Sequence, residues 1–222
     1  MHFTHIPLPR EVPALKQINE NGTRFYTTPE GNKYPSITTV LSEYNKEAIY
    51  KWRQRVGNEE ANKISQTAST RGTRIHKLCE DFLNNKDITF KTPLDAELFN
   101  SLKPELYKID NIHSQELRMY SDHLRVAGTV DCIGDYNNRR SVIDFKTSSK
   151  QKDKCLIENY FMQAAAYAIM FEELYSIPVA QIVIMIAVQD HEPQVFVEKR
   201  DNYVKQLLYF RDLFESKHGI LI

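Results

Sequence analysis

The spacing of apolar residues is helical in the first half of the chain and changes near residue 111. Apolar positions recur every three or four residues over Ile37–Leu83, which predicts helices in pieces, and again over Leu94–Ile109. Before them, Thr23–Thr27 and Lys33–Tyr34 flank a Pro-Glu-Gly-Asn segment and predict a hairpin. Residues 1–110 are therefore expected to be mainly helical. Helix breaks are expected at Gly57 and Gly72.

After residue 111, apolar and polar residues alternate as they do in half-buried strands. The expected strands are Gln115–Tyr120, His123–Tyr136, Ser141–Thr147, Gln181–Val188 and Pro193–Glu198, and the expected helices are Ile157–Tyr175 and Asn202–Lys217. This order predicts an α/β fold in which helices flank a mixed central β-sheet. Without an internal repeat or a linker, a single domain over residues 1–222 is expected, with the sheet and its flanking helices in residues 111–222.

Composition excludes several classes of protein. Hydrophobic residues make up 41% of the chain and charged residues 26%, which is typical of a globular protein rather than a disordered one. The formal net charge of zero argues against a protein that coats nucleic acid by charge alone, although it permits a local basic channel. The most apolar stretch, Ile177–Val188, is too short to span a membrane. No export or organelle signal is visible, so we expect a cytoplasmic protein, in the host cytoplasm if a phage encodes it.

Cysteine usage and missing loop motifs exclude some cofactors. Cys79, Cys132 and Cys155 stand far apart and lack the close spacing of a zinc or iron–sulfur site, so reduced thiols are expected. No phosphate-binding Gly-Lys-Ser/Thr loop occurs, so no nucleotide cofactor is expected.

Two acids and a lysine stand among apolar residues of two neighbouring predicted strands. Asp131 follows Gly-Thr-Val in one strand, and the next holds Asp144 and Lys146 within Val-Ile-Asp-Phe-Lys-Thr. Residues two apart in a strand share a face, so Asp144 and Lys146 project together, whereas Ile143 and Phe145 point to the opposite layer. A hairpin would bring Asp131 near Asp144 at its open end.

Paired carboxylates bind a hard cation such as Mg²⁺. A lysine beside that cation orients or deprotonates the attacking water, or neutralises charge that develops on a phosphate. The alternative is that Asp131 is a turn residue and that Asp144 and Lys146 form a surface ion pair. An unpaired charge among apolar residues is costly, which favours the cation site.

This arrangement resembles the PD-(D/E)XK nuclease superfamily, in which an acid on one strand and an acid-any-lysine triplet on the next form the catalytic core. Asp131 matches the first acid, and Asp144-Phe145-Lys146 matches the triplet. The resemblance implies a restriction-endonuclease-like core in which Asp131, Asp144 and Lys146 are catalytic. It also implies one or two Mg²⁺ or Mn²⁺ ions held by both acids and the backbone carbonyl of Phe145, and a DNA contact from Thr147.

Two helices extend the resemblance to the RecB-type exonucleases. Arg71–Glu80 looks like the helix whose histidine joins the metal ligands, which implies His76 as a ligand and Glu80 as a further candidate. The alternative is that His76 caps the edge of the core. Downstream, Gln163 and Tyr167 share one helical face, and the resemblance implies that they position the DNA strand or the catalytic lysine. An ordinary amphipathic helix is the alternative there.

Two further segments contain candidate site residues, each of which also has a purely structural explanation. Glu116 precedes a segment like the family's glutamate-bearing strand, and it is either an additional metal ligand or an exposed edge-strand acid. Tyr34–Leu41 resembles a segment of the mitochondrial genome maintenance exonucleases and their phage relatives. There, Ser36 and Thr38 suit a phosphate at a helix start or simple capping. RecB-type relatives often carry four cysteines around an iron–sulfur cluster, but this chain has three, so no cluster is expected.

Basic and aromatic side chains suggest the substrate. A channel for the DNA backbone is expected from basic residues, although the lysines among them also fit a solvated loop: Arg71, Arg74, Arg139, Arg140, Lys150, Lys152 and Lys154. Tyr34, Tyr160 and Tyr167 are expected to stack on bases of a single strand. No helicase motif occurs, so strand separation requires a partner such as a helicase or a single-strand-binding protein, or a substrate that is already single-stranded.

The sequence therefore predicts a metal-dependent deoxyribonuclease. We expect an exonuclease that hydrolyses single-stranded or frayed DNA, leaves 5′ phosphates, and serves replication, recombination, repair or degradation of DNA. One alternative is a structure-selective endonuclease for flaps or branches, which would cut circular single strands. Another is a non-catalytic DNA-binding subunit, which would need a broken triad, whereas Asp131, Asp144 and Lys146 are all present.

Overall fold

A mixed five-stranded sheet forms the centre of the computed structural model, which describes residues 2–12, 14–20 and 22–219. Its strands lie in the order β4 (Ile109–Ser121), β5 (Val126–Tyr136), β6 (Arg139–Ser148), β7 (Gln181–Val188) and β8 (Gln194–Lys199). The first three form the predicted antiparallel meander. Strand β7 runs parallel to β6, because α5 (Glu158–Tyr175) connects them, and β8 returns antiparallel to β7. The predicted α/β class is therefore confirmed.

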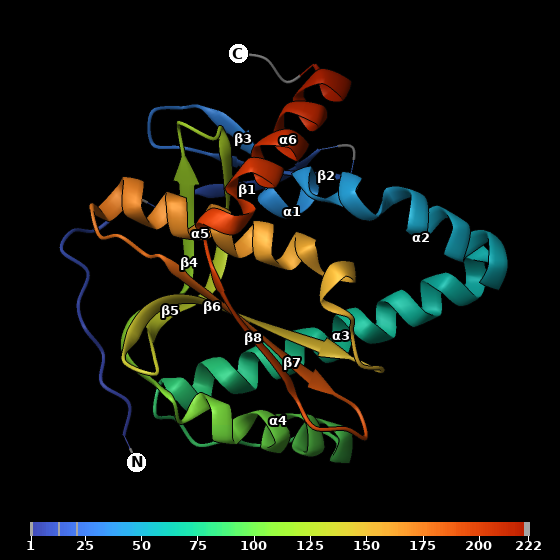
Figure 1. Ribbon diagram of the computed structural model, residues 1–222, viewed down its shortest axis with the longest axis vertical. Coiled ribbons are helices and arrows are strands. Elements are labelled where there is room, and N and C mark those ends of the chain that lie inside the picture. Colours follow the sequence, from blue (N-terminus) through green and yellow to red (C-terminus); the bar gives the residue numbers. More distant parts are fainter. Residues whose placement is uncertain (1, 13, 21, 220–222) are drawn as a thin grey trace.

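Helices cover both faces of this sheet (Figure 1). Helices α3 (Asn58–Leu83) and α4 (Pro93–Leu106) pack on one face, and α5 packs on the other with α6 (Asp201–His218) beside it. Alternate residues of β6 enter the two cores, as the period-2 pattern predicts. Val142 packs with the α5 side, whereas Ile143 and Phe145 pack with α3 and α4. Full burial of a side chain such as Phe145 contributes about 2–3 kcal/mol.

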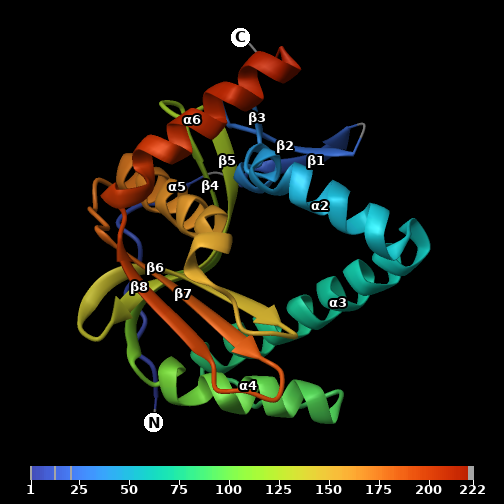
Figure 2. The ribbon, with the colours of Figure 1, turned by 45° about the vertical axis from the view of Figure 1, so that its right-hand side comes forward.

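The N-terminal part adds a smaller sheet and a projecting pair of helices. Strands β1 (Lys16–Glu20), β2 (Thr23–Thr27) and β3 (Lys33–Pro35) are antiparallel, which confirms the β2–β3 hairpin. Strand β1 was not expected, because its residues Lys-Gln-Ile-Asn-Glu show no apolar alternation. The short helix α1 (Ile37–Val40) and α2 (Ser42–Val56) follow, and α2 and the first half of α3 extend away from the sheet (Figure 2). No residue of α2 is buried.

Element boundaries differ from the prediction where tertiary packing intervenes. Gly72 was expected to break a helix, but α3 runs through it without interruption. A helical glycine costs only about 1 kcal/mol relative to alanine, which packing of the rest of α3 outweighs. Ile109 begins β4 instead of ending α4, and β5 begins at Val126 because the preceding residues form a turn. Among the described residues, no helix has the length and apolarity needed to cross a membrane.

Candidate active site

Three acidic residues lie in a row across β4, β5 and β6. The register of β4 against β5 places Glu116 opposite Asp131. The ladder between β5 and β6 ends at the pair Cys132–Ile143, one residue before Asp131 and Asp144. Residues opposite one another on antiparallel strands share a face. The two acids therefore meet at the open end of the β5–β6 hairpin, as predicted, and Glu116 joins them.

The backbone of Glu116 is unusual for a strand residue. Its φ is +50°, in the left-handed region that non-glycine residues rarely adopt. Such a conformation costs on the order of 1–3 kcal/mol and persists where the surrounding structure imposes it. No sequence pattern indicates this conformation, because Glu116 stands in a stretch that alternates like an ordinary strand.

Helix α3 contributes His76 to the same place. The Nδ1 atom of His76 lies 3.4 Å from Oδ2 of Asp131. One ligand atom from each of His76, Glu116 and Asp131 lies within 4.8 Å of the others. Glu80, the other candidate on α3, is outside this group and pairs with Lys77 at 3.0 Å. Two carboxylates and one imidazole form a donor set that fits a divalent cation.

Asp144 and Lys146 form the second half of the site, against α5. Asp144 is 0% exposed and makes an ion pair with Lys146. Gln163 donates from Nε2 to Oδ1 of Asp144 at 3.3 Å and to the hydroxyl oxygen of Tyr167 at 3.3 Å. The ammonium of Lys146 also lies 5.2 Å from the ring centroid of Tyr160. Residues of α5 therefore contact both the acid and the lysine, and Gln163 and Tyr167 lie on one helical face as predicted.

Burial is the largest influence on the pKa of each acid. Burial by itself raises the pKa of Asp131, but His76, Lys146 and the backbone amide of Phe145, which donates to Asp131 at 2.8 Å, together hold it below its usual range. Burial raises the pKa of Asp144 to about 6, with Lys146 opposing and Asp131 adding to the shift. Burial and Asp131 also raise the pKa of Glu116. Burial, with a neighbouring carboxylate, therefore disfavours the charged forms of Asp144 and Glu116.

Several residues expected to contact DNA are buried or already bonded. Ser36 is 1% exposed, and its hydroxyl accepts the Thr39 amide as the cap of α1, with the Thr38 hydroxyl 2.9 Å away. The capping alternative therefore describes Ser36. Stacking of bases on Tyr34 or Tyr167 was wrong, because both rings are buried. The half-buried Tyr160 is still open to such a role.

The expected basic channel is only partly present. Arg139 and Arg140 lie at the closed tip of the β5–β6 hairpin, five and four residues, or about 16 and 13 Å, along the strand from Asp144. Arg140 donates to His113 there. The prediction that these two arginines line the channel was wrong. Although they are close to Asp144 in sequence, they lie at the opposite end of the hairpin.

Two other basic residues are neutralised by acids far away in sequence. Arg74 donates from Nε to both oxygens of Asp95 at 2.9 Å, and Lys154 pairs with Glu198. Lys150 is exposed in the loop after β6. Arg71 is different, since it is buried and donates to the hydroxyl of Thr147 at 3.3 Å.

Gly128 has a role that the sequence interpretation missed. A Cβ atom at this position would lie 2.7 Å from Cε1 of Tyr167 and 3.2 Å from Cγ2 of Ile37. The absence of a side chain therefore lets Tyr167 pack against β5 beside Asp131. The sequence shows a glycine three residues before Asp131, but the ring that requires it, that of Tyr167, lies on a helix about forty positions later.

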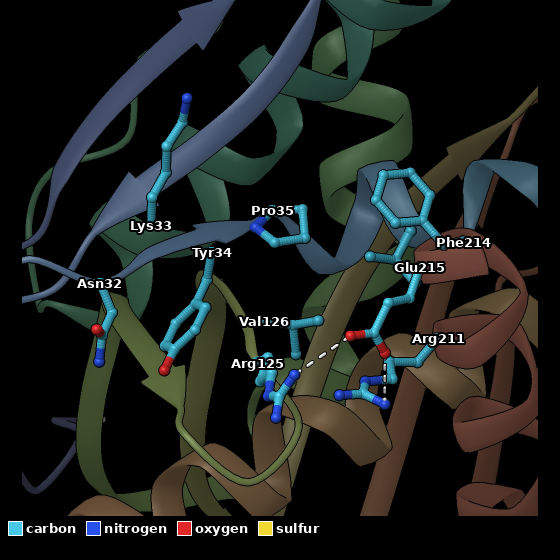
Figure 3. A pocket seen from close by; sticks show the side chains of 10 residues that line it. Asn32, Lys33, Tyr34, Pro35, Arg125, Val126, Arg211, Phe214 and Glu215 are labelled. Carbon is cyan, nitrogen blue, oxygen red and sulfur yellow. Dashed lines mark hydrogen bonds and ion pairs between the residues drawn. The ribbon is translucent and has the colours of Figure 1, made fainter. Parts of the chain in front are cut away.

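A separate pocket lies between β3, α6 and the β4–β5 turn (Figure 3). Two of its basic groups are paired within the pocket, because Arg125 and Arg211 both contact Glu215, at 3.3 and 2.9 Å, and the third, Lys33, pairs with Glu20. Tyr34 donates to Asp122 at 2.6 Å. None of the residues that line the pocket belongs to the cluster around Asp131.

Known proteins support the resemblance that the motifs indicate. The chain is 28% identical over 203 residues to mitochondrial genome maintenance exonuclease 1 of Xenopus tropicalis, covering 85% of this chain and 55% of that protein. It is 26% identical over 178 residues to the Homo sapiens protein of that name, covering 73% and 51%. The chain thus spans about half the length of these curated relatives. The suspected relationship to these exonucleases is confirmed.

Two other comparisons complete this picture. No protein-family model matches the chain. A crystal structure of a candidate exonuclease from Eubacterium rectale aligns with a TM-score of 0.49 at 14% identity, covering 70% of this chain and 69% of that one.

Proposed function

We propose that this relative of mitochondrial genome maintenance exonuclease 1 is a metal-dependent DNA exonuclease acting on single-stranded or frayed ends. The observation that carries the proposal is the convergence of His76, Glu116 and Asp131 within 4.8 Å, beside the Asp144–Lys146 ion pair. This set comes from three strands and one helix. Such convergence of charged groups around the buried Asp144 is costly for folding, which favours a functional reason for it.

The donor set fits Mg²⁺ or Mn²⁺. Carboxylate oxygens are the preferred ligands of these hard cations, and His76 and Glu116 extend the set that Asp131 begins. The raised pKa of Glu116, caused by burial and by the negative charge of Asp131, is consistent with this, because a bound cation would offset the repulsion between the two acids. When bound, the ion would polarise the phosphate and activate water for hydrolysis. We include Asp144 and the carbonyl of Phe145 among its proposed ligands.

The chain's own residues position the lysine and the phosphate. Asp144 keeps Lys146 at the end of β6, and Gln163 and Tyr167 fix Asp144 from the other side. The Lys146 ammonium would then stabilise the negative charge that develops on the phosphate. Burial lowers and Asp144 raises the pKa of Lys146, and the net shift is upward, so this group stays protonated at neutral pH.

We also propose that residues 1–222 work as one nuclease domain, because α3 supplies His76 to a site built on β4, β5 and β6. A reducing compartment such as the cytoplasm is part of the proposal. It is supported by Cys79, Cys132 and Cys155, which are free thiols.

End-labelled single-stranded oligonucleotides with Mg²⁺ or Mn²⁺ test this function. We expect the parent to shorten them progressively, and Asp131→Ala and Lys146→Ala to lose at least about a hundredfold in rate. Arg139→Ala, at the far tip of the hairpin, is the matched control and keeps the parent rate. Labels at the 5′ and 3′ ends report polarity. Equal cleavage by Asp131→Ala and the parent would overturn the site, and cleavage of circular single strands would show an endonuclease instead.

A further inference from the structure

One guanidinium group beside the proposed site is buried without a carboxylate partner. Arg71 on α3 is 9% exposed, and its only hydrogen bond among the described residues runs from Nε to the hydroxyl of Thr147. Burial and the nearby Arg74 lower the pKa of Arg71, and no acid raises it. Arginine nevertheless stays charged at neutral pH. A largely covered cation is therefore held without any carboxylate of the described residues in ion-pair contact.

This arrangement contrasts with three half-buried arginines, Arg74, Arg200 and Arg211, each of which makes an ion pair with at least one carboxylate. Two others, Arg53 and Arg140, donate to neutral groups, but both are less buried than Arg71. Burying an uncompensated charge costs several kcal/mol, so such a group calls for an anion from outside the protein.

The position of Arg71 specifies where that anion would bind. Thr147 directly follows Lys146 on β6, and Arg71 precedes His76 by five residues, about 7.5 Å along α3. Helix α3 passes close to the end of β6 here, since a Cβ atom at Gly72 would stand 3.9 Å from the Thr147 hydroxyl. The guanidinium is therefore held at the end of β6, between the helix that carries His76 and the strand that carries Lys146.

We propose that Arg71 and Thr147 form a binding site for one internucleotide phosphate of the DNA strand, adjacent to the phosphate that is hydrolysed. This inference rests on the proposed nuclease function. Because Thr147 engages only Nε, the terminal nitrogens of Arg71 are available to donate paired N–H groups to phosphate oxygens. The phosphate charge supplies the partner that the chain lacks, and it sets the register of the strand relative to Lys146.

Binding of a single-stranded oligonucleotide, with Ca²⁺ in place of Mg²⁺ to slow cleavage, tests the proposal. One phosphate at a time is replaced by a neutral methylphosphonate. We expect the parent to lose about tenfold or more in affinity at one position near the scissile phosphate, and Arg71→Met to show no loss at that position. The slope of log K against log salt should fall by about 0.7 in Arg71→Met, as for one lost contact with a single strand. Arg71→Lys should keep most of this slope.

Thr147→Val separates this role from a purely structural one. It removes the hydrogen bond that holds Arg71 but keeps the charge, so the salt slope should stay close to that of the parent. If Thr147→Val and Arg71→Met weaken binding equally with unchanged slopes, Arg71 only fastens α3 to β6, and the proposal is overturned. Normal cleavage by the parent without any position-specific methylphosphonate effect overturns the phosphate site alone. A parent that neither binds nor cuts DNA overturns the proposed function as well.

Discussion

Gly128→Ala places a methyl group in the packed space between β5 and α5. The new Cβ atom would stand 2.7 Å from Cε1 of Tyr167, 3.1 Å from its hydroxyl oxygen and 3.2 Å from Cγ2 of Ile37. Ordinary van der Waals contact begins at about 3.4 Å. Tyr167 is 2% exposed and Ile37 is fully buried, so neither moves freely into solvent. Overpacking of this kind costs about 1–3 kcal/mol, which lowers the melting temperature of a chain of this length by about 2–12 °C.

The same substitution should reduce cleavage without touching a charged residue. Displacement of Tyr167 disturbs its hydrogen bond with Gln163, which also donates to Asp144 at 3.3 Å. A shift of about 1 Å in a positioning group costs up to about a hundredfold in rate. We therefore expect a ten- to hundredfold loss in the rate at which Gly128→Ala cuts end-labelled single strands, together with the lower melting temperature.

Gly72→Ala is the matched control. Its methyl group meets only Oγ1 of Thr147, at 3.9 Å, inside the continuous helix α3. It should stabilise the protein by about 0.5–1 kcal/mol through helix propensity. In a double-mutant cycle, Tyr167→Leu should remove most of the penalty of Gly128→Ala, because the ring is the group that is crowded. A Gly128→Ala variant with the parent's melting temperature and rate would refute the close packing of Tyr167.

Three further predictions concern the acids of the site and an ion pair near it. In the metal-free protein, Asp144 has a pKa of about 6, above its value in the unfolded chain, so it adds stability that is present below pH 4 and is lost as pH rises through 6. Urea unfolding should therefore show the parent losing roughly 2–3 kcal/mol relative to Asp144→Asn between pH 4 and pH 7, and a flat difference would contradict the raised pKa. Glu116→Gln should weaken Mn²⁺ binding at least about tenfold in calorimetric titrations, whereas Glu80→Gln should change it little. A larger loss in Glu80→Gln than in Glu116→Gln would show that Glu80, and not Glu116, is the ligand. Arg74→Ala should destabilise the protein by about 3 kcal/mol in thermal unfolding, because it leaves the buried Asp95 without its partner, and an unchanged melting temperature would argue against that ion pair.

The strands of the central sheet and the shared face of Asp144 and Lys146 follow from local pattern. Strand β7 begins and ends where its run of β-branched residues predicts, at Gln181 and Val188. Alternation in β6 sends Ile143 and Phe145 to one core and Asp144 to the opposite face. These features depend on the period-2 geometry of a strand, so the order of apolar and polar residues within the strand is enough to predict them.

The completeness of the site depends instead on contacts between distant segments. Glu116 reaches Asp131 through the register of β4 against β5 and a positive φ, neither of which its own neighbours in sequence specify. The rings of Tyr34 and Tyr167 are buried by elements far from them, so they are not available for stacking. Whether a basic side chain faces solvent, an acid or a ligand is likewise set by partners 21 or more residues away, as for Arg74 and Asp95. Backbone periodicity is a local property, whereas strand register and the neutralisation of buried charge arise only when the packed chain brings such segments into contact.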